Sequence, residues 1–165
     1  MAELFLWYNT LMEHSPEDWM NRAAKVATEA LCHRSKCGAV IVSGDEVIGS
    51  GYNAPPLDKE ENRRCDMEFD RNRKPKYDLT CCLHAEWRAM MDALKNHPSK
   101  LPGSRLYFTR VDDTGKVLRS GEPYCTECSR FALDLGIATF ALWHEDGIVE
   151  YPTKEYNDLS YQYHQ

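Results

Sequence analysis

The stretch that decides the fold is GAVIVSGDEVIGSGY, residues 38–52. Its first part, Gly38–Val42, is a short apolar run rich in β-branched residues. Val47–Tyr52 is a second run of similar length. The four residues between them, Ser43–Glu46, have the composition of a turn. Two such runs joined by a short polar connection are typical of a β-hairpin. The sequence therefore predicts two neighbouring antiparallel strands here.

Helical patterns lie on both sides of this hairpin. The segment Ser15–Asp18 predicts a helix start, with serine as the N-cap, proline at the first helical position and an acid at the third. A third helix is predicted from about Cys125 to Leu135, ending at Gly136. Between these two, a second helix is indicated by apolar residues at i, i+3, i+4 and i+7, all four of which we expect in the core: Trp87, Met90, Met91 and Leu94.

Two more strands complete the predicted sheet, at Leu106–Thr109 and Ile137–Trp143, and a final strand or helix is expected within Val149–Tyr161. The order α, β, β, α, β, α, β predicts an α/β protein with three layers, α/β/α, around a mixed central sheet of about five strands. The chain has 165 residues, 42% of them hydrophobic and 28% charged. This composition suits one globular domain over residues 1–165.

The N-terminal segment Met1–His14 contains a short apolar run, Leu4–Tyr8, without a basic region before it. Five apolar residues are too few for the core of a signal peptide or for a membrane span. We expect a packed arm or a short first helix, in a cytoplasmic protein that does not bind membranes.

The long segment Asn53–Thr80 has no periodicity and predicts a loop, and loops of this length in a compact domain are usually functional or mobile. Its cations alternate with acidic residues, so they either contact a phosphate group or form a solvated loop with compensating charges. These cations are Arg63, Arg64, Arg71, Arg73, Lys74 and Lys76.

The formal net charge is −6 at pH 7, with an isoelectric point near 5.5. Proteins that bind long nucleic acids usually present a basic face. We therefore expect no long nucleic acid as a partner, although a few local cations can still hold a small phosphorylated ligand.

The chain contains seven cysteines. In a reducing cytosol, clustered cysteines are more often metal ligands or reactive groups than disulfides, and the odd number also fits complete pairing poorly. Metal binding is the leading interpretation.

Two short motifs supply a complete set of reactive groups. His84-Ala85-Glu86 stands at the start of the second predicted helix, and Pro123–Cys128, which contains a CxxC pair, stands at the start of the third. The positive end of a helix dipole favours thiolates. One histidine and two cysteines, His84, Cys125 and Cys128, suit Zn²⁺ and leave a fourth position for water, as in catalytic zinc sites. Zinc lowers the pKa of such a water to about 7, and Glu86 can carry protons beside it.

Neither motif is specific when it stands alone. A CxxC pair also occurs in thiol redox proteins and as half of a structural zinc site, and HAE is a common tripeptide. The chain could then be a redox protein or a non-catalytic, zinc-stabilised interaction module, in which Glu86 would have no role. The two motifs together, in this order and each opening a helix, favour a catalytic site.

The pair H-x-E and P-C-x-x-C is the signature of zinc deaminases. From about Ala24 to Trp143 the chain resembles the cytidine and deoxycytidylate deaminase superfamily, and it is most similar to deoxycytidylate (dCMP) deaminases. The likeness includes residues 37–42 and 49–56 as well as both motifs. It implies a cytidine deaminase-like fold, a homo-oligomer, a catalytic zinc and hydrolytic deamination of a cytosine nucleotide, dCMP to dUMP with release of ammonia.

The resemblance also implies that Asn53 holds the sugar hydroxyl and that the backbone of Ala85 helps to place the base. From the residues alone, Asn53 can equally be a strand terminator, since asparagine favours turns. Two departures from the family pattern lie beside the expected pocket: Tyr124 separates Pro123 from Cys125, and the connection from Thr109 to Pro123 is long. Deaminases of another base, of a nucleoside or of a pterin or riboflavin precursor are the alternatives within the superfamily.

Some phage-type dCMP deaminases, which this arrangement of cysteines resembles, hold a second, structural zinc. That resemblance implies ligands from Cys32, Cys65 and the pair Cys81 and Cys82, with Cys37 or His33 as another source of the fourth ligand. The alternative is that these thiols act as small hydrophobic residues in the core.

Overall fold

The computed structural model describes residues 14–68, 70, 72 and 80–163. The packed arm or first helix expected for Met1–His14 therefore lies outside the described residues, apart from His14. The predicted hairpin is present: β1 (Lys36–Ser43) pairs antiparallel with β2 (Glu46–Tyr52), from Gly38 opposite Tyr52 to Ser43 opposite Glu46.

The central sheet has the order β2-β1-β3-β5-β6. β1 and β3 are antiparallel, β3 and β5 are parallel, and β5 and β6 are antiparallel, so the sheet is mixed as predicted. The remaining strands are β3 (Arg105–Val111), β4 (Val117–Leu118), β5 (Thr139–His144) and β6 (Gly147–Pro152). The short strand β4 lies outside this order and pairs with β3. Its two residues are too few to show an alternating pattern in the sequence.

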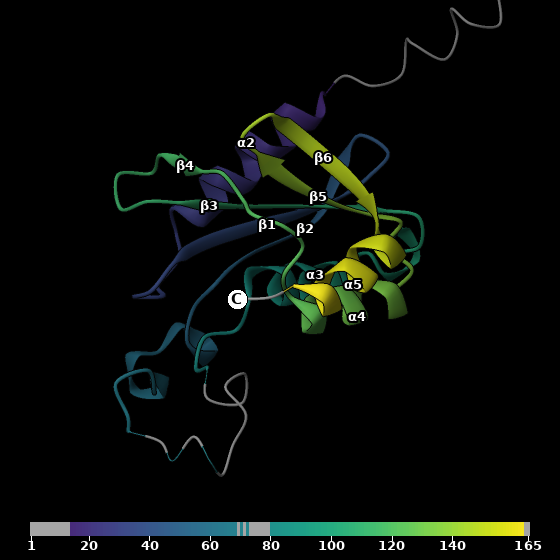
Figure 1. Ribbon diagram of the computed structural model, residues 1–165. Helices are drawn as coiled ribbons and strands as arrows, with labels where there is room; N and C mark the ends of the chain where they lie inside the picture. The colour runs from purple at the N-terminus through teal and green to yellow at the C-terminus, as the bar shows by residue number, and fades with distance from the viewer. Residues whose placement is uncertain (1–13, 69, 71, 73–79, 164–165) are drawn as a thin grey trace, which may run out of the picture.

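Helices cover both faces of this sheet (Figure 1). On one face α2 (Pro16–Ala27) packs Trp19 and Met20 against Val40, Val42 and Tyr107. On the other face lie α3 (Ala85–Asn96), α4 (Thr126–Asp134) and α5 (Thr153–Gln162). The three-layer α/β/α fold is therefore confirmed.

The caps follow the sequence signals closely. Ser15 caps α2 by accepting a hydrogen bond from the Asp18 N–H at 3.3 Å, while the carboxylate of Asp18 accepts one from the Ser15 N–H at 2.7 Å. This reciprocal capping box satisfies two backbone donors that a helix start otherwise leaves open. At the end of α4, Gly136 has φ 74°, the left-handed conformation that favours glycine after a helix.

The buried face of α3 differs from the prediction. Met90 is fully buried, but Trp87 is only half-buried, and Met91 and Leu94 are 44% and 45% exposed. The helix instead packs on the sheet through a row of small residues one turn apart: Ala85, Ala89 and Ala93. This row contacts the part of β2 that carries Gly49 and Gly51. Helix and strand approach so closely that only small side chains fit between them, and Met91 and Leu94 turn toward solvent.

The segment Val149–Tyr161 contains both expected alternatives, since β6 runs directly into α5. Within the long segment Asn53–Thr80, the described part includes two single-turn 3₁₀ helices, Pro56–Asp58 and Glu60–Asn62. Among the described residues, no helix has both the length and the apolar character that a membrane crossing requires.

Candidate metal centre and active site

The three predicted metal ligands lie together at the N-termini of α3 and α4. His84 is the N-cap of α3 and Cys125 is the N-cap of α4, with Cys128 in the first turn. The Nδ1 atom of His84 lies 3.2 Å from Cys128 Sγ and 3.4 Å from Cys125 Sγ, and the two sulfurs are 3.1 Å apart. We name His84, Cys125 and Cys128 the ligand triad.

The electrostatics of the ligand triad favour a cation. The hydrogen bond from Cys128, with a further one from His84, lowers the pKa of Cys125 to about 5 against the effect of burial. The hydrogen bond to Cys125 raises the pKa of His84 to about 9, whereas burial raises the pKa of Cys128. One nitrogen and two sulfur donors fit the tetrahedral preference of zinc and leave one position open. Because metal ligands must be deprotonated, zinc would displace the protons that these groups now share.

Glu86 lies next to the ligand triad in the interior of the protein. Only 5% of the residue is exposed, although it sits in the first turn of α3. Burial, with a smaller contribution from the charge of Cys125, raises the pKa of Glu86 to about 7. A carboxyl group with this pKa can take up and release protons at neutral pH.

Two members of the ligand triad, His84 and Cys125, line a pocket of about 190 Å³ together with Glu86. Three residues that line this pocket were not predicted from the sequence. Cys37 and Phe108 reach the pocket from β1 and β3, and Tyr156 reaches it from α5. Strand alternation could have indicated the first two, but no local signal marks Tyr156. The full lining is Cys37, Asn53, His84, Ala85, Glu86, Phe108, Tyr124, Cys125 and Tyr156.

Aromatic contacts fix the wall contributed by α5. The ring of Tyr156 stacks on Phe140 with a centroid distance of 4.0 Å, and its hydroxyl accepts a hydrogen bond from the Tyr124 N–H at 3.4 Å. The ring of Tyr124 in turn meets Tyr163 edge to face at 4.9 Å. The residue that departs from the family pattern is therefore part of the pocket wall.

Asn53 lines the pocket, but its side chain also holds the start of β1. Its Oδ1 accepts a hydrogen bond from the Cys37 N–H at 2.8 Å, and its Nδ2 donates one to the Ser35 carbonyl at 2.8 Å. These two hydrogen bonds are the ones expected if Asn53 ends a strand. Because an amide has two donor hydrogens and two acceptor lone pairs, one of each is left for a ligand, and the sugar contact stays a prediction.

The connection that follows Asn53 is tied to α3 by an ion pair. Asp58 accepts hydrogen bonds from the Tyr52 hydroxyl at 2.8 Å and from Arg88 at 2.7 Å, and Arg88 also donates to the Pro55 carbonyl. Leu57 and Asp58 have φ values of 60° and 58°, in the left-handed region that non-glycine residues rarely occupy. The ion pair holds this backbone beside the first turn of α3.

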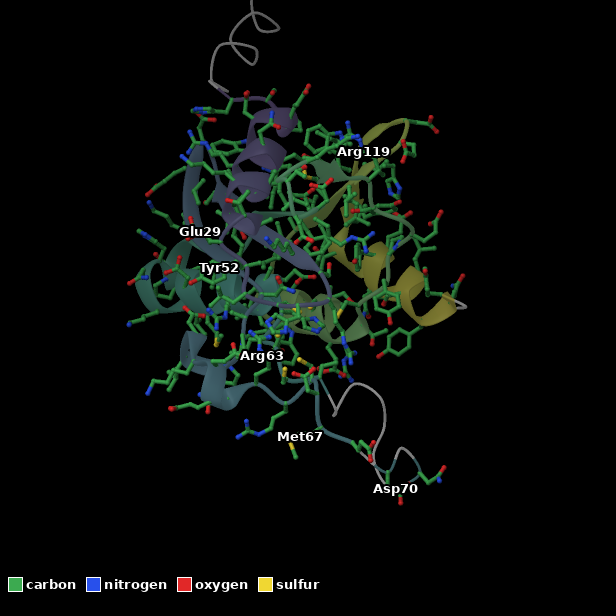
Figure 2. All side chains as sticks on the ribbon, turned by 90° about the vertical axis from the view of Figure 1, so that its left-hand side faces the viewer. Glu29, Tyr52, Arg63, Met67, Asp70 and Arg119 are labelled. Carbon is green, nitrogen blue, oxygen red and sulfur yellow. The ribbon has the colours of Figure 1, made fainter. Side chains whose placement is uncertain are left out.

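Two cations of the long loop, Arg63 and Arg64, already have partners within the protein. Arg63 pairs with Glu60 and donates to the Leu31 carbonyl, while Arg64 donates to the carbonyls of Glu61 and Arg63. This matches compensating charge rather than a phosphate site. Figure 2 shows Arg63 close to the body of the protein, and Met67 and Asp70 farther out along the loop. The other four cations for which both interpretations were open lie outside the described residues: Arg71, Arg73, Lys74 and Lys76.

The remaining thiols form a second group. Cys81 and Cys82 have sulfurs 3.9 Å apart, with Cys82 in contact with Cys32 and Cys81 in contact with Cys65. Among the described residues, the set in this region whose ligand atoms all lie within 4.8 Å of one another is a different one: His33, Cys65 and Asp66.

A mixed sheet with a His-Cys-Cys triad and a buried glutamate at one pocket defines a zinc-dependent hydrolase. The sequence matches the family described as the cytidine and deoxycytidylate deaminase zinc-binding region over residues 13–143, and the chain belongs to this family. No curated protein sequence matches the chain.

Solved structures show the same fold. The cytidine deaminase from Burkholderia pseudomallei superposes with a TM-score of 0.57 at 17% identity, covering 87% of this chain and 96% of the other. The dCMP deaminase from the cyanophage S-TIM5, in complex with dCMP and dUMP, gives a TM-score of 0.54 at 24% identity, covering 75% and 76%. Its apo form gives 0.51 at 22% identity, covering 76% and 79%.

Proposed function

We propose that the protein hydrolyses the amino group of a cytosine nucleotide, converting dCMP to dUMP and ammonia. The observation that carries the proposal is the buried Glu86 beside the ligand triad, in the lining of a pocket with aromatic walls. A structural zinc site needs no buried carboxyl group next to it, so the glutamate favours catalysis over a non-catalytic zinc module.

The residues divide into clear roles. His84, Cys125 and Cys128 would hold zinc, which supplies an activated water at neutral pH when it is bound. Glu86 would hold the proton that a water molecule beside it gives up, and would return protons to the substrate. Both protons of one water molecule finally reside on substrate nitrogens, one on N3 of the uracil ring and one on the departing ammonia. A carboxyl group with a pKa near 7 suits this exchange in both directions.

The walls of the pocket would position the base. Phe108, Tyr124 and Tyr156 offer apolar ring surface, on which a pyrimidine can pack. Ala85 and Asn53 contribute polar groups at the same pocket, in the roles that the family resemblance implies. The volume of about 190 Å³ lies below the roughly 300–1,000 Å³ of pockets for drug-sized ligands. It suits the base alone, with the sugar and phosphate at the rim.

The test is release of ammonia by the zinc-loaded protein from cytosine, cytidine, deoxycytidine, CMP, dCMP and dCTP. We expect the highest kcat/KM for dCMP. Equal kcat/KM for deoxycytidine and dCMP would contradict the choice of a nucleotide. No ammonia from any of these compounds, with zinc bound, would leave a non-catalytic zinc module or a deaminase of a pterin or riboflavin precursor.

Two further assignments remain predictions. A homo-oligomer is expected from the family resemblance, and light scattering measures its mass. A second zinc, with ligands from Cys32, Cys65, Cys81 and Cys82, is expected from the resemblance alone; among the described residues, the set with ligand atoms within 4.8 Å of one another in this region joins Cys65 to His33 and Asp66.

A further inference from the structure

We propose that Arg110 binds the 5′-phosphate of the substrate and thereby makes the enzyme prefer a nucleotide to a nucleoside. The inference rests on the proposed function, because it places the phosphate relative to a cytosine held at the ligand triad.

The position of Arg110 follows from the register of the sheet. Arg110 on β3 is paired directly with Cys37 on β1. Directly paired residues point to the same face, with Cβ atoms about 4.5–5.5 Å apart. Phe108 stands two residues earlier on β3 and therefore shares this face. Cys37 and Phe108 both line the pocket, whereas Arg110 is not among its lining residues. Arg110 therefore lies just beyond the pocket, on the same face of the sheet and two residues past Phe108 toward the end of β3.

The charge of Arg110 is available to a ligand. The residue is half-buried, and no other described residue gives its guanidinium a hydrogen bond or an ion pair. In contrast, Arg63 and Arg88 are paired with Glu60 and Asp58. A partly desolvated guanidinium is stabilised by an anion that accepts two parallel hydrogen bonds, and phosphate has this geometry.

The size of the pocket also indicates that the phosphate lies outside it. If the base fills the pocket of about 190 Å³ beside the ligand triad, the sugar and phosphate must lie outside this pocket. Arg110 follows the lining residue Phe108 on this face of the sheet, and the described loop arginines Arg63 and Arg64 already have protein partners. A phosphate held here would bind the substrate without touching the reacting carbon.

The test compares R110Q with R105Q in the zinc-loaded protein. Arg105 lies at the opposite end of β3, where it donates to the Gly44 carbonyl, so its loss removes the same charge from the same strand. For R110Q we expect kcat/KM for dCMP to fall about 10- to 100-fold, through KM, the loss typical of hydrogen bonds to a charged group. The value for deoxycytidine should stay within about 2-fold, and R105Q should keep the preference of the parent protein.

Calorimetric binding of the products gives a readout that needs no turnover. The Kd for dUMP should rise about 10- to 100-fold in R110Q, while the Kd for deoxyuridine stays unchanged. Retention of the phosphate preference in R110Q, equal losses for nucleoside and nucleotide, or the same loss in R105Q would each overturn the inference. If the parent protein releases no ammonia, the proposed function fails, whereas binding of dUMP that depends on Arg110 would still establish the phosphate site.

Discussion

A Cβ atom on Gly51 would lie 2.4 Å from the carbonyl oxygen of Ala85, and equally close to the backbone nitrogen of Ala89. Ala85 stands between His84, a member of the ligand triad, and Glu86. The missing side chain at residue 51 therefore sets how closely the start of α3 approaches the sheet, and with it where both groups lie.

We predict that Gly51→Ala damages the site as well as the fold. The added methyl group must push the first turn of α3 outward, and overpacking of this kind typically costs about 1–3 kcal/mol of stability. The variant should show a lower free energy of unfolding in urea and a reduced kcat. Gly121→Ala is the matched control, since a Cβ atom there meets nothing within 4 Å. Full activity of Gly51→Ala would show that α3 adjusts without moving its N-terminus.

Glu86→Gln keeps the size of the side chain but removes its ability to exchange protons. We expect unchanged zinc content and folding, with kcat lower by at least about 10²–10⁴-fold, the range typical of general acid–base groups. Elemental analysis and ammonia release measure the two quantities on one preparation. A variant that deaminates at nearly the parental rate would remove Glu86 from the mechanism.

Cys125→Ser removes one sulfur ligand from the triad and the thiolate that pairs with His84. We expect loss of the catalytic zinc, loss of deamination and lower thermal stability, because metal binding is coupled to folding. Zinc per chain and the melting temperature are the measurements. The same zinc content as in the parent protein would contradict the assignment of this ligand.

Asp58→Asn tests the ion pair that ties the loop to α3. Burial acts to raise the pKa of Asp58, but hydrogen bonds from Tyr52 and Arg88 and the charge of Arg88 outweigh it and lower the pKa below 3.8. A lowered pKa means that the ionised carboxylate stabilises the fold above pH 3.8 and that this contribution is lost as the pH falls through the lowered value. Since the side chain is 39% exposed, we expect a cost of less than about 1 kcal/mol at neutral pH.

Urea unfolding over a pH series measures this difference. The gap between the parent protein and Asp58→Asn should be constant above about pH 5 and should close in acid. Asp146→Asn, at an exposed turn position, should show no such gap. A gap that persists in acid would mean that the Asn substitution acts through backbone geometry instead of charge.

The second thiol group makes a prediction about metal content. Pure protein dialysed against metal-free buffer should carry two zinc ions per chain, and Cys65→Ser should carry one, keep part of its activity and become sensitive to proteases in the loop. One zinc ion in the parent protein would leave Cys32, Cys81 and Cys82 as packing residues.

Local signals in the sequence predict much of this structure. The hairpin, the capping box at Ser15 and the helix starts at His84 and Cys125 depend on residues within a few positions of each other, and each is present. The ligand triad was predictable because both of its parts open helices.

Features that depend on distant residues were not predictable in this way. The apolar spacing of α3 pointed to Met91 and Leu94, but glycines on β2 decide which face of the helix packs inward. The wall formed by Tyr156 depends on α5 folding back over the sheet, and the position of Arg110 depends on a strand register that no local pattern encodes. The charges of the loop allowed two interpretations until the partners of Arg63 were known.

Because Tyr156 comes after the metal ligands in the sequence, the pocket is completed only after those ligands have been synthesised. The ribosome makes the metal ligands at 84, 125 and 128 before it makes α5, so at about 5–20 residues per second the nascent chain holds these ligands without Tyr156 for about 1–6 s. During that interval the thiols of Cys125 and Cys128 lack the cover that Tyr156 gives to the pocket in the finished fold. Early zinc delivery would protect them until the last helix closes over the site.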